Sequence, residues 1–355
     1  MDRNKRIGIA GVAFFAVLIL AVLFGQKQEE KELSRYTATF LDVFDTRTDI
    51  VGYSADQEAF TEQVALLKEK LEYYHKLYDI YNDYEGVSNI KTINDNAGVA
   101  PVEVNEDIIN LLLFSKEMYY ETNGQMNIAM GSVLKIWHNY RDAGINNPME
   151  AALPSMEELI AASAHCDIEQ IVIDEAAMTV YLADADMSID VGSIGKGYAV
   201  QRVAEYAKEI GMKSALLSVG GNVCAVGTKL DGSDWRVGIQ NPDTTSDEAH
   251  VGKVDVADAC VVTSGDYQRY YVVDGEKYCH IIDGDTLMPA DYFSSVSIVT
   301  TDSGRADALS TSVFNMPFEE GLVLVEGLPD VEAHWVLKDG SRQHSSGFSQ
   351  FVTQP

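Results

Sequence analysis

Hydrophobic residues alternate with polar ones near the start of the chain and then switch to a helical period. Residues 35–53 alternate well enough to predict a strand or a hairpin. Residues 56–84 place apolar and aromatic side chains three or four positions apart, which predicts a long amphipathic helix with its tyrosines in the core. A second helix is expected over 105–120, because Asn105 is a good N-cap and Asn123-Gly124 is a good helix stop.

The rest of the chain is dominated by short strands. Residues 170–174 and 179–183 predict a β-hairpin, and 188–191 predict a short strand that runs into a helix ending near residue 210. Further elements are expected in this order: strands at 214–219, 235–240, 254–262, 270–273, 277–282 and 295–300, a helix at 307–314 and a strand at 333–338. This order indicates the α+β class, with mixed or antiparallel sheets and packed helices in one unit over 31–355.

The first 30 residues have a different character. Arg3, Lys5 and Arg6 precede an uninterrupted apolar run over 7–24, and a polar stretch follows it. The run approaches the ~20 residues that span a bilayer and does not end in a small-x-small pattern, so we expect an uncleaved membrane anchor rather than a cleaved signal. Basic residues before the run keep that end cytoplasmic, which places the chain from about Lys27 onward on the extracytoplasmic face of the cell membrane.

Composition narrows the possible partners. The chain has 355 residues and a formal net charge of −29, which argues against a nucleic-acid partner and favours divalent cations or basic partner surfaces. The cysteines are far apart and form no C-x-x-C pair, which argues against a structural zinc site. We expect buried free thiols, and if the exported chain forms a disulfide, the sequence does not choose its pairing. The cysteines are Cys166, Cys224, Cys260 and Cys279.

The segment over 188–200 is a candidate ligand site, because three glycines lead into the start of a helix. Such a start offers unpaired backbone N–H groups and partial positive charge, which suit an anion such as phosphate. The spacing matches neither a P-loop nor a dinucleotide-binding motif, so a turn without a ligand is an equal alternative. Asp190 and Lys196 favour a ligand, because an acid and a base on one turn can hold opposite parts of a polar molecule.

Two further clusters carry candidate chemistry. Asp307 and Thr311 lie four residues apart on one helical face, and their hard oxygens suit Mg²⁺, although an exposed aspartate near a helix start is the simpler reading of this pair alone. His280 lies at a strand end, shortly before Asp283, where an imidazole can remove a proton from a hydroxyl group. A lone histidine more often has a structural role.

Six segments in chain order resemble one known family, the ApbE family of FAD:protein FMN transferases. The resemblance covers almost all of the chain after the apolar run and implies a T-fold-like α+β fold. It also implies an Mg²⁺-dependent reaction that splits FAD, transfers FMN to a Thr or Ser hydroxyl of a target protein and releases AMP. The segments are Asp190-Val-Gly-Ser-Ile-Gly-Lys-Gly-Tyr-Ala, Ser218-Val-Gly-Gly-Asn222, Trp235-Arg-Val-Gly-Ile-Gln-Asn-Pro242, Thr263-Ser-Gly-Asp-Tyr267, His280-Ile-Ile-Asp283 and Ala306-Asp-Ala-Leu-Ser-Thr311.

The resemblance implies roles for individual residues. Asp307 and Thr311 would hold Mg²⁺ together with the backbone carbonyl of Ser193, with Ser310 as a weaker candidate. His280 would be the base that deprotonates the acceptor hydroxyl. Contacts with FAD are implied for Asp190, Lys196, Ile282, Asn127, Ile128, Ala129, Tyr81 and Phe44.

The chain departs from the family pattern in places, and other functions of the same site stay open. Phe44-Asp45-Thr46 stands where the family has Met-Gly-Thr, and Lys196 stands where some members carry Glu. One alternative is an FAD pyrophosphatase that yields FMN and AMP; another is a non-catalytic flavin-binding protein of the envelope. The chain contains no Ser/Thr-Gly-Ala-Ser/Thr acceptor segment, so the expected acceptor is a different, exported redox protein.

Overall fold

The computed structural model describes residues 32–352, so the apolar run and the anchor expected there lie outside the described residues. Within 32–352, no helix combines the length and the apolar character needed to cross a bilayer. The helices are α2 (Gln57–Tyr78), α3 (Ile90–Asp95), α4 (Glu106–Glu121), α5 (Gly131–Asn146), α6 (Met156–Ser163), α7 (Gly195–Glu209), α8 (Ser303–Phe314) and α9 (Phe318–Glu326). The strands are β1 (Ser34–Val43), β2 (Thr46–Ser54), β3 (Val102–Glu103), β4 (Ile171–Asp174), β5 (Thr179–Leu182), β6 (Ala215–Val219), β7 (Asn222–Val226), β8 (Trp235–Gln240), β9 (His250–Val256), β10 (Cys260–Gly265), β11 (Tyr270–Val273), β12 (Glu276–Cys279), β13 (Phe293–Thr300), β14 (Glu332–Leu337) and β15 (Arg342–His344).

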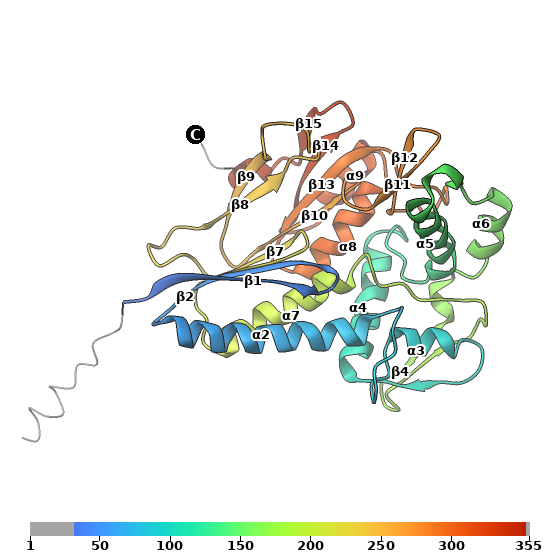
Figure 1. Ribbon diagram of the computed structural model, residues 1–355, viewed down its shortest axis with the longest axis horizontal. Helices are drawn as coiled ribbons and strands as arrows, with labels where there is room; N and C mark the ends of the chain where they lie inside the picture. Colours follow the sequence, from blue (N-terminus) through green and yellow to red (C-terminus); the bar gives the residue numbers. More distant parts are fainter. Residues whose placement is uncertain (1–31, 353–355) are drawn as a thin grey trace, which may run out of the picture.

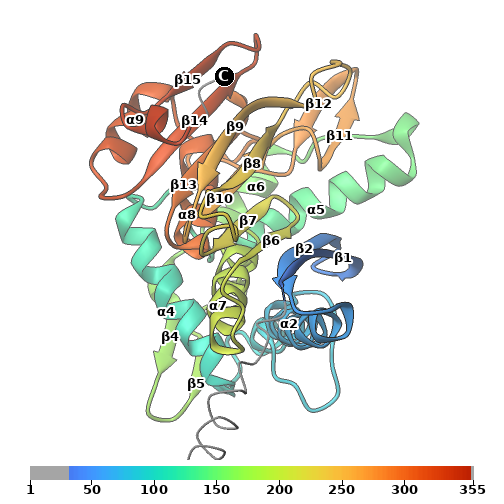
Figure 2. The same cartoon turned by 90° about the vertical axis from the view of Figure 1, so that its left-hand side faces the viewer.

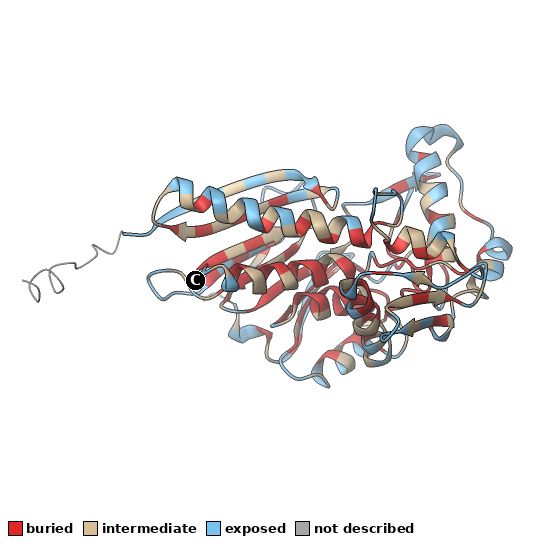
Figure 3. Ribbon diagram, turned by 90° about the horizontal axis from the view of Figure 1, so that it is seen from below, coloured by how far each residue is buried: buried red, intermediate tan, exposed pale blue. Residues whose placement is uncertain are grey.

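An eight-stranded sheet forms the middle layer of the molecule. Its order is β1-β2-β6-β7-β10-β13-β14-β15, and every neighbouring pair is antiparallel. Helices α2, α7 and α8 pack on one face and the β8–β9 pair covers the other (Figures 1 and 2). Buried and exposed positions alternate along α2, as expected for an amphipathic helix that lies on the surface (Figure 3). The predicted α+β class with antiparallel sheets is confirmed.

The large sheet, with its helices on one face and the β8–β9 pair on the other, forms the main sandwich. A smaller hydrophobic core lies beside it. Helices α5 and α6 pack there with the hairpin β11–β12, at one end of the molecule (Figure 1). Trp137 of α5 is buried in this core, and its indole N–H donates to the carbonyl of Leu287 at 2.9 Å. The candidate site residues therefore lie on elements that belong to two separate hydrophobic cores.

Several predicted elements are confirmed with small boundary shifts. Helix α4 begins directly after Asn105, whose side chain accepts a hydrogen bond from the backbone N–H of Asp107 at 2.9 Å. The hairpin of β4 and β5 and the hairpin of β1 and β2 also lie where the alternation places them. Local signals were sufficient here because each element is specified by its own cap, turn or alternation.

The long first helix ends earlier than predicted. It stops at Tyr78 rather than near residue 84, because Asp79 adopts an extended backbone and its carboxylate accepts the N–H groups of Tyr81 and Asn82. Such side-chain bonds offer the backbone an alternative to the helix. Tyr81 consequently lies in a loop.

The predicted strand at 188–191 is wrong. Only a single bridge from Ser188 to Met130 is present. The side chain of Asn94 accepts from the N–H of Ile189 at 2.7 Å and donates to its carbonyl at 2.9 Å, and so replaces the neighbouring strand that these groups would otherwise need.

The single strand predicted over 254–262 is also wrong. It is divided between β9 and β10, which belong to different layers, by a turn in which Asp258 has a φ of 47°. A left-handed residue ends the extended backbone and lets the chain change sheets.

Two cysteines are joined, against the expectation of free thiols. Cys224 and Cys260 form a disulfide across directly paired positions of β7 and β10. The two residues are 36 positions apart in the sequence, so only the pairing of the strands shows that they are neighbours. Of the other two, Cys279 is buried and Cys166 is half-buried, and both are free.

We predict that acid destabilises the protein through His334. This residue of β14 is 6% exposed, and burial, together with Arg342 and His344, lowers its pKa to about 4. Its pKa rises to its ordinary value, 6.5, on unfolding. Because the folded-state pKa is the lower one, the stability due to neutral His334 is complete above pH 6.5 and is lost as the pH falls toward 4. The loss reaches about 3 kcal/mol.

The measurement is the free energy of unfolding between pH 8 and pH 4 for the wild type and for His334→Phe. The variant is expected to show a shallower decline over this range, whereas His250→Phe, at an exposed position of β9, keeps the wild-type decline. Equal declines in the wild type and His334→Phe would contradict the assignment.

Candidate active site

A cavity of about 500 Å³ lies between the main sandwich and the smaller core. Helices α5, α7 and α8 contribute to its walls, together with the loops after β1, β6 and β12. Most of the residues singled out from the sequence line it, although they are spread over almost the whole described chain. They are Phe44, Tyr81, Asn127, Asp190, Ser193, Lys196, His280, Ile282, Asp307 and Thr311.

Three of the singled-out residues do not line the cavity. The carbonyl of Ile128 accepts from the N–H of Asp190 at 2.8 Å, and the N–H of Ala129 donates to the side chain of Asn127 at 2.9 Å. The Ser310 hydroxyl donates to the carbonyl of Asp307 at 3.0 Å. These residues are buried behind the wall and support it.

The start of α7 contacts a carboxylate of the protein itself. The N–H of Gly197 donates to Asp307 Oδ2 at 2.7 Å, and Asn222 Nδ2 lies 3.3 Å from the same oxygen. A Cβ atom at Gly197 would overlap the carbonyl of Ser303 and the side chain of Asp307. The glycine is therefore needed for the close approach of α7 to α8, and the anion beside this turn is Asp307.

We predict that Gly197→Ala destabilises the fold. Either α7 and α8 separate or the Asp307 side chain moves, and overpacking of this kind costs about 3 kcal/mol. Thermal or denaturant unfolding measures the loss. Gly252→Ala on β9 is the matched control, because the nearest heavy atom to the added methyl group is 4.0 Å away. An unchanged stability in Gly197→Ala would show that the helices can separate without loss.

Three oxygens of this wall suit a hard cation. No described residue donates a hydrogen bond to the carbonyl of Ser193, which precedes Ile194, the N-cap residue of α7, and so lies outside the helical hydrogen-bond pattern. No described residue donates to Asp307 Oδ1 either, and Thr311 lines the cavity one helical turn further along α8. Oxygen atoms from a carboxylate, a hydroxyl and a carbonyl are ligands that Mg²⁺ accepts, so the donor set fits this ion.

Burial disfavours the charged forms of Asp307 and Lys196, which both lie on this wall. Burial raises the pKa of Asp307, while Lys196 and the Gly197 N–H act against the rise. Burial likewise lowers the pKa of Lys196, and Asp307 acts against the fall. The Lys196 ammonium also donates to the carbonyl of Gly220 at 2.9 Å. A bound divalent cation would favour the ionised form of Asp307.

His280 lies at the base of the β11–β12 hairpin. Its backbone N–H donates to the carbonyl of Arg269 at 3.1 Å, and its ring Nδ1 lies 3.1 Å from the same oxygen. A carbonyl only accepts, so Nδ1 carries the proton and Nε2 keeps its lone pair. Burial, followed by the charges of Arg269 and Arg141, lowers the pKa of His280 to about 3. The ring is therefore neutral and can accept a proton.

Asp283 does not orient this histidine. Its carboxylate accepts instead from the N–H of Asp285 and from the hydroxyl of Thr286, within its own loop. The carbonyl of Arg269 takes the orienting role that a neighbouring carboxylate often has.

One face of α5 forms a wall that the sequence analysis missed. Met130, Leu134, His138 and Arg141 line the cavity at intervals of about one helical turn. His138 Nδ1 lies 3.0 Å from the hydroxyl of Tyr81, and its Nε2 lies 4.0 Å from Asp190. The helical spacing of these residues was visible in the sequence, but the pattern does not say which face of a helix meets a cavity.

The Phe44 turn keeps a left-handed backbone without the glycine of the family pattern. Phe44 and Asp45 join β1 to β2 with φ values of 53° and 49°. Bulky residues rarely adopt this conformation, and it persists only where the surroundings hold it. Here the N–H of Phe44 donates to His75 Nδ1 at 3.3 Å, and the two rings pack edge to face.

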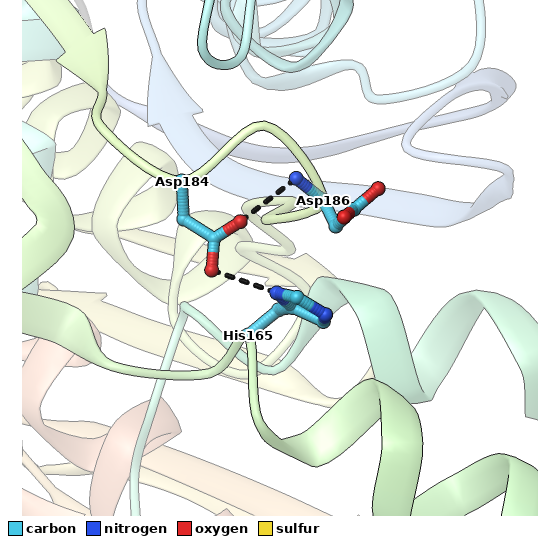
Figure 4. A group of neighbouring side chains, drawn as sticks. All are labelled: His165, Asp184 and Asp186. Carbon is cyan, nitrogen blue, oxygen red and sulfur yellow. Dashed lines mark hydrogen bonds and ion pairs between the residues drawn. The ribbon is translucent and has the colours of Figure 1, made fainter.

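A second cluster of possible metal ligands lies outside the cavity. His165, Asp184 and Asp186 place their ligand atoms within 4.8 Å of one another. Both oxygens of Asp184 are already bonded, one to His165 Nδ1 at 2.7 Å and one to the N–H of Asp186 at 2.9 Å (Figure 4). An ion pair between histidine and aspartate accounts for this arrangement, and we assign it no ligand.

Comparisons with known proteins identify the family and agree with the fold. The model of the ApbE family matches residues 44–335. A relative from Treponema pallidum (strain Nichols), named FAD:protein FMN transferase, is 34% identical over 274 residues, which cover 73% of this chain and 74% of the relative. A relative of the same name from Klebsiella pneumoniae (strain 342) is 29% identical over 288 residues, or 81% of this chain and 84% of the relative.

A solved structure has the same fold. The crystal structure of the ApbE protein from Thermotoga maritima superimposes with a TM-score of 0.79 at 28% identity, and covers 90% of this chain and 100% of that one. The fold and these matches define the class, which is an enzyme of antiparallel α+β architecture. The chain belongs to the ApbE family.

Proposed function

We propose that this protein transfers FMN from FAD to a Ser or Thr hydroxyl of another protein and releases AMP. The observation that carries this proposal is that one cavity holds both a neutral imidazole and oxygens suited to Mg²⁺. Family membership supports flavin transfer, because the relatives described above carry that activity in their names.

The proposed step forms one phosphorus–oxygen bond and breaks another. His280 Nε2 accepts the proton of the acceptor hydroxyl, and the hydroxyl oxygen bonds to the phosphorus of the FMN half. The bond from this phosphorus to the bridging oxygen breaks, and AMP leaves with the bonding electron pair. Positioning and charge neutralisation are the main demands of phosphoryl transfer.

The metal would be held by Asp307, Thr311 and the carbonyl of Ser193. When bound, Mg²⁺ supplies charge neutralisation at the pyrophosphate. Ser310 would support this group indirectly, because its hydroxyl lies 2.8 Å from that of Ser264, which in turn lies 3.4 Å from Thr311. Hydroxyl groups of α8 and β10 would thus support Thr311 as a ligand through hydrogen bonds.

The proposed FAD contacts surround this centre. Asp190 offers a buried carboxylate and Lys196 a buried ammonium, which suit hydroxyl or amino groups and phosphate oxygens respectively. Tyr81 is 61% exposed and stands at the cavity, where its ring can stack on an aromatic part of the ligand. The remaining proposed contacts are Phe44, Asn127, Ile128, Ala129 and Ile282.

The proposed location follows from the first 30 residues. An apolar run behind basic residues supports an anchor in the cell membrane, with a T-fold-like catalytic domain on the extracytoplasmic face. The acceptor would then be an exported redox protein.

We predict that His280→Ala loses transfer and keeps FAD binding. Removal of a general base slows the step by about 10²–10⁴-fold, whereas the substituted ring is not a charged contact with FAD. The assay follows the fluorescent FMN adduct on an acceptor domain that contains a Ser/Thr-Gly-Ala-Ser/Thr segment. His250→Ala, on an exposed part of β9, is the control and should behave as the wild type. Normal transfer by His280→Ala would refute the base.

The same assay separates transfer from hydrolysis. AMP release that requires the acceptor supports a transferase. Equal AMP release without any acceptor would show that water is the nucleophile and that the enzyme is a pyrophosphatase. FAD binding without Mg²⁺ and with no turnover would indicate a binding protein.

We predict that Asp307→Asn raises the Mg²⁺ concentration needed for half-maximal transfer by roughly tenfold or more, because the neutral amide is a weaker ligand. The amide oxygen can still accept the N–H of Gly197, so the fold should be retained. Calorimetric titration of Mg²⁺ in the presence of FAD gives the same comparison without turnover. Asp291→Asn, at an exposed side chain, is the control. An unchanged Mg²⁺ requirement would exclude Asp307 as a ligand.

A further inference from the structure

Arg269 differs from the other cations of the cavity. Three fixed cations line the cavity: Arg141, Lys196 and Arg269. Arg141 is paired with Asp142 at 3.2 Å, and Lys196 donates to the carbonyl of Gly220. The guanidinium of Arg269 makes neither an ion pair nor a hydrogen bond with any residue in 32–352. It is a free, exposed cation on the wall of the proposed active site.

Hydrogen bonds between Arg269 and His280 fix the positions of both residues. The carbonyl of Arg269 accepts both the backbone N–H and the ring Nδ1–H of His280. Arg269 directly precedes β11 and His280 directly follows β12, so both side chains start from the base of one hairpin. The proposed base and the free cation therefore lie on the same side of the cavity.

The charge of Arg269 affects several other groups that line the cavity. It lowers the pKa of His280 and contributes to lowering the pKa of Lys196 and that of His138. Cations that disfavour one another in this way are destabilising until an anion binds between them. Carboxylates also line the cavity, yet none of those in residues 32–352 forms an ion pair with Arg269, so this cation points to an anionic ligand.

We propose that the guanidinium of Arg269 binds the non-bridging oxygens of the phosphoryl group that is transferred, and stabilises their charge in the transition state. This role rests on the proposed function. Negative charge in phosphoryl transfer spreads over these oxygens, and a planar guanidinium can hold two of them at once.

Because Arg269 and His280 lie at the base of the same hairpin, Arg269 is expected to contact the transferred phosphoryl group rather than the leaving AMP. The acceptor oxygen, whose proton goes to His280 Nε2, attacks phosphorus from the side of the base. The broken bond to the bridging oxygen lies in line on the opposite side, and AMP departs there with the electron pair. A cation beside the base therefore meets the phosphoryl group under attack, and it also reduces the repulsion felt by the incoming oxygen.

The test compares Arg269→Ala and Arg269→Lys with the wild type. The assay uses FAD, MgCl₂ and the acceptor domain with a Ser/Thr-Gly-Ala-Ser/Thr segment. We expect kcat for transfer to fall about 10²–10³-fold in Arg269→Ala, as on loss of other donors to transition-state charge. The Kd for FAD should change less than kcat. Arg269→Lys should recover only part of the rate, because an ammonium cannot make the two-pronged contact.

Two further readouts separate catalysis from a structural role. Added guanidinium ion should partly restore transfer by Arg269→Ala. The acid limb of the pH–rate profile should move to higher pH in this variant, because removal of the Arg269 charge raises the pKa of His280, although burial, Arg141 and Lys196 still oppose its protonation. The melting temperature should stay unchanged, since the side chain is exposed. Arg35→Ala is the matched control, at an exposed position on β1 away from the cavity.

The outcomes distinguish the two proposals. If the wild type transfers FMN and Arg269→Ala transfers it within threefold of that rate, the role of Arg269 is refuted and the proposed function stands. An unshifted acid limb together with no rescue by guanidinium would equally refute it. If the wild type neither transfers FMN nor releases AMP, the proposed function fails and the role of Arg269 fails with it.

Discussion

The contact between the N–H of Gly197 and the carboxylate of Asp307 is the constraint on which the site depends. The absence of a side chain at Gly197 allows α7 and α8 to approach closely, and the contact uses a backbone donor in the first turn of α7 that has no partner within the helix. It also fixes Oδ2 of Asp307, while no described residue donates to Oδ1. A helix start of the kind that binds phosphate thus contacts a carboxylate of the protein itself. Glycine is required there because any side chain would fill the space that the carboxylate occupies.

Burial gives the cavity its chemical character. The protein is strongly acidic, yet the cavity gathers Lys196, Arg141 and Arg269 beside Asp190 and Asp307. Burial disfavours charge on Asp307 and Lys196 and, with the neighbouring cations, keeps His280 neutral. A bound ligand of opposite charge would favour the charged forms of Asp307 and Lys196 and so offset the cost of their burial.

Local sequence signals predicted most elements, and most of the site residues predicted from the sequence and from the family resemblance line the cavity. Asn105 and the β4–β5 hairpin were readable because caps and alternation act within a few residues. The six ordered segments pointed to the family, and most of the residues that they implied meet in one cavity. The predictions that failed depended on distant partners: Asn94 replaces a strand partner for Ile189, and the pairing of β7 with β10 joins Cys224 to Cys260.

The sequence by itself determined the α+β class, the family and the types of group available for the chemistry, because periodicity and ordered motifs are properties of the chain alone. Only the tertiary structure decided which groups are free to act. It bonded the N–H of Gly197 to Asp307, placed the hydroxyl of Ser310 against the carbonyl of Asp307 behind the cavity wall, and left the guanidinium of Arg269 without a partner among residues 32–352. Hydrogen-bond partners far apart in sequence are chosen by packing, and no local pattern records that choice.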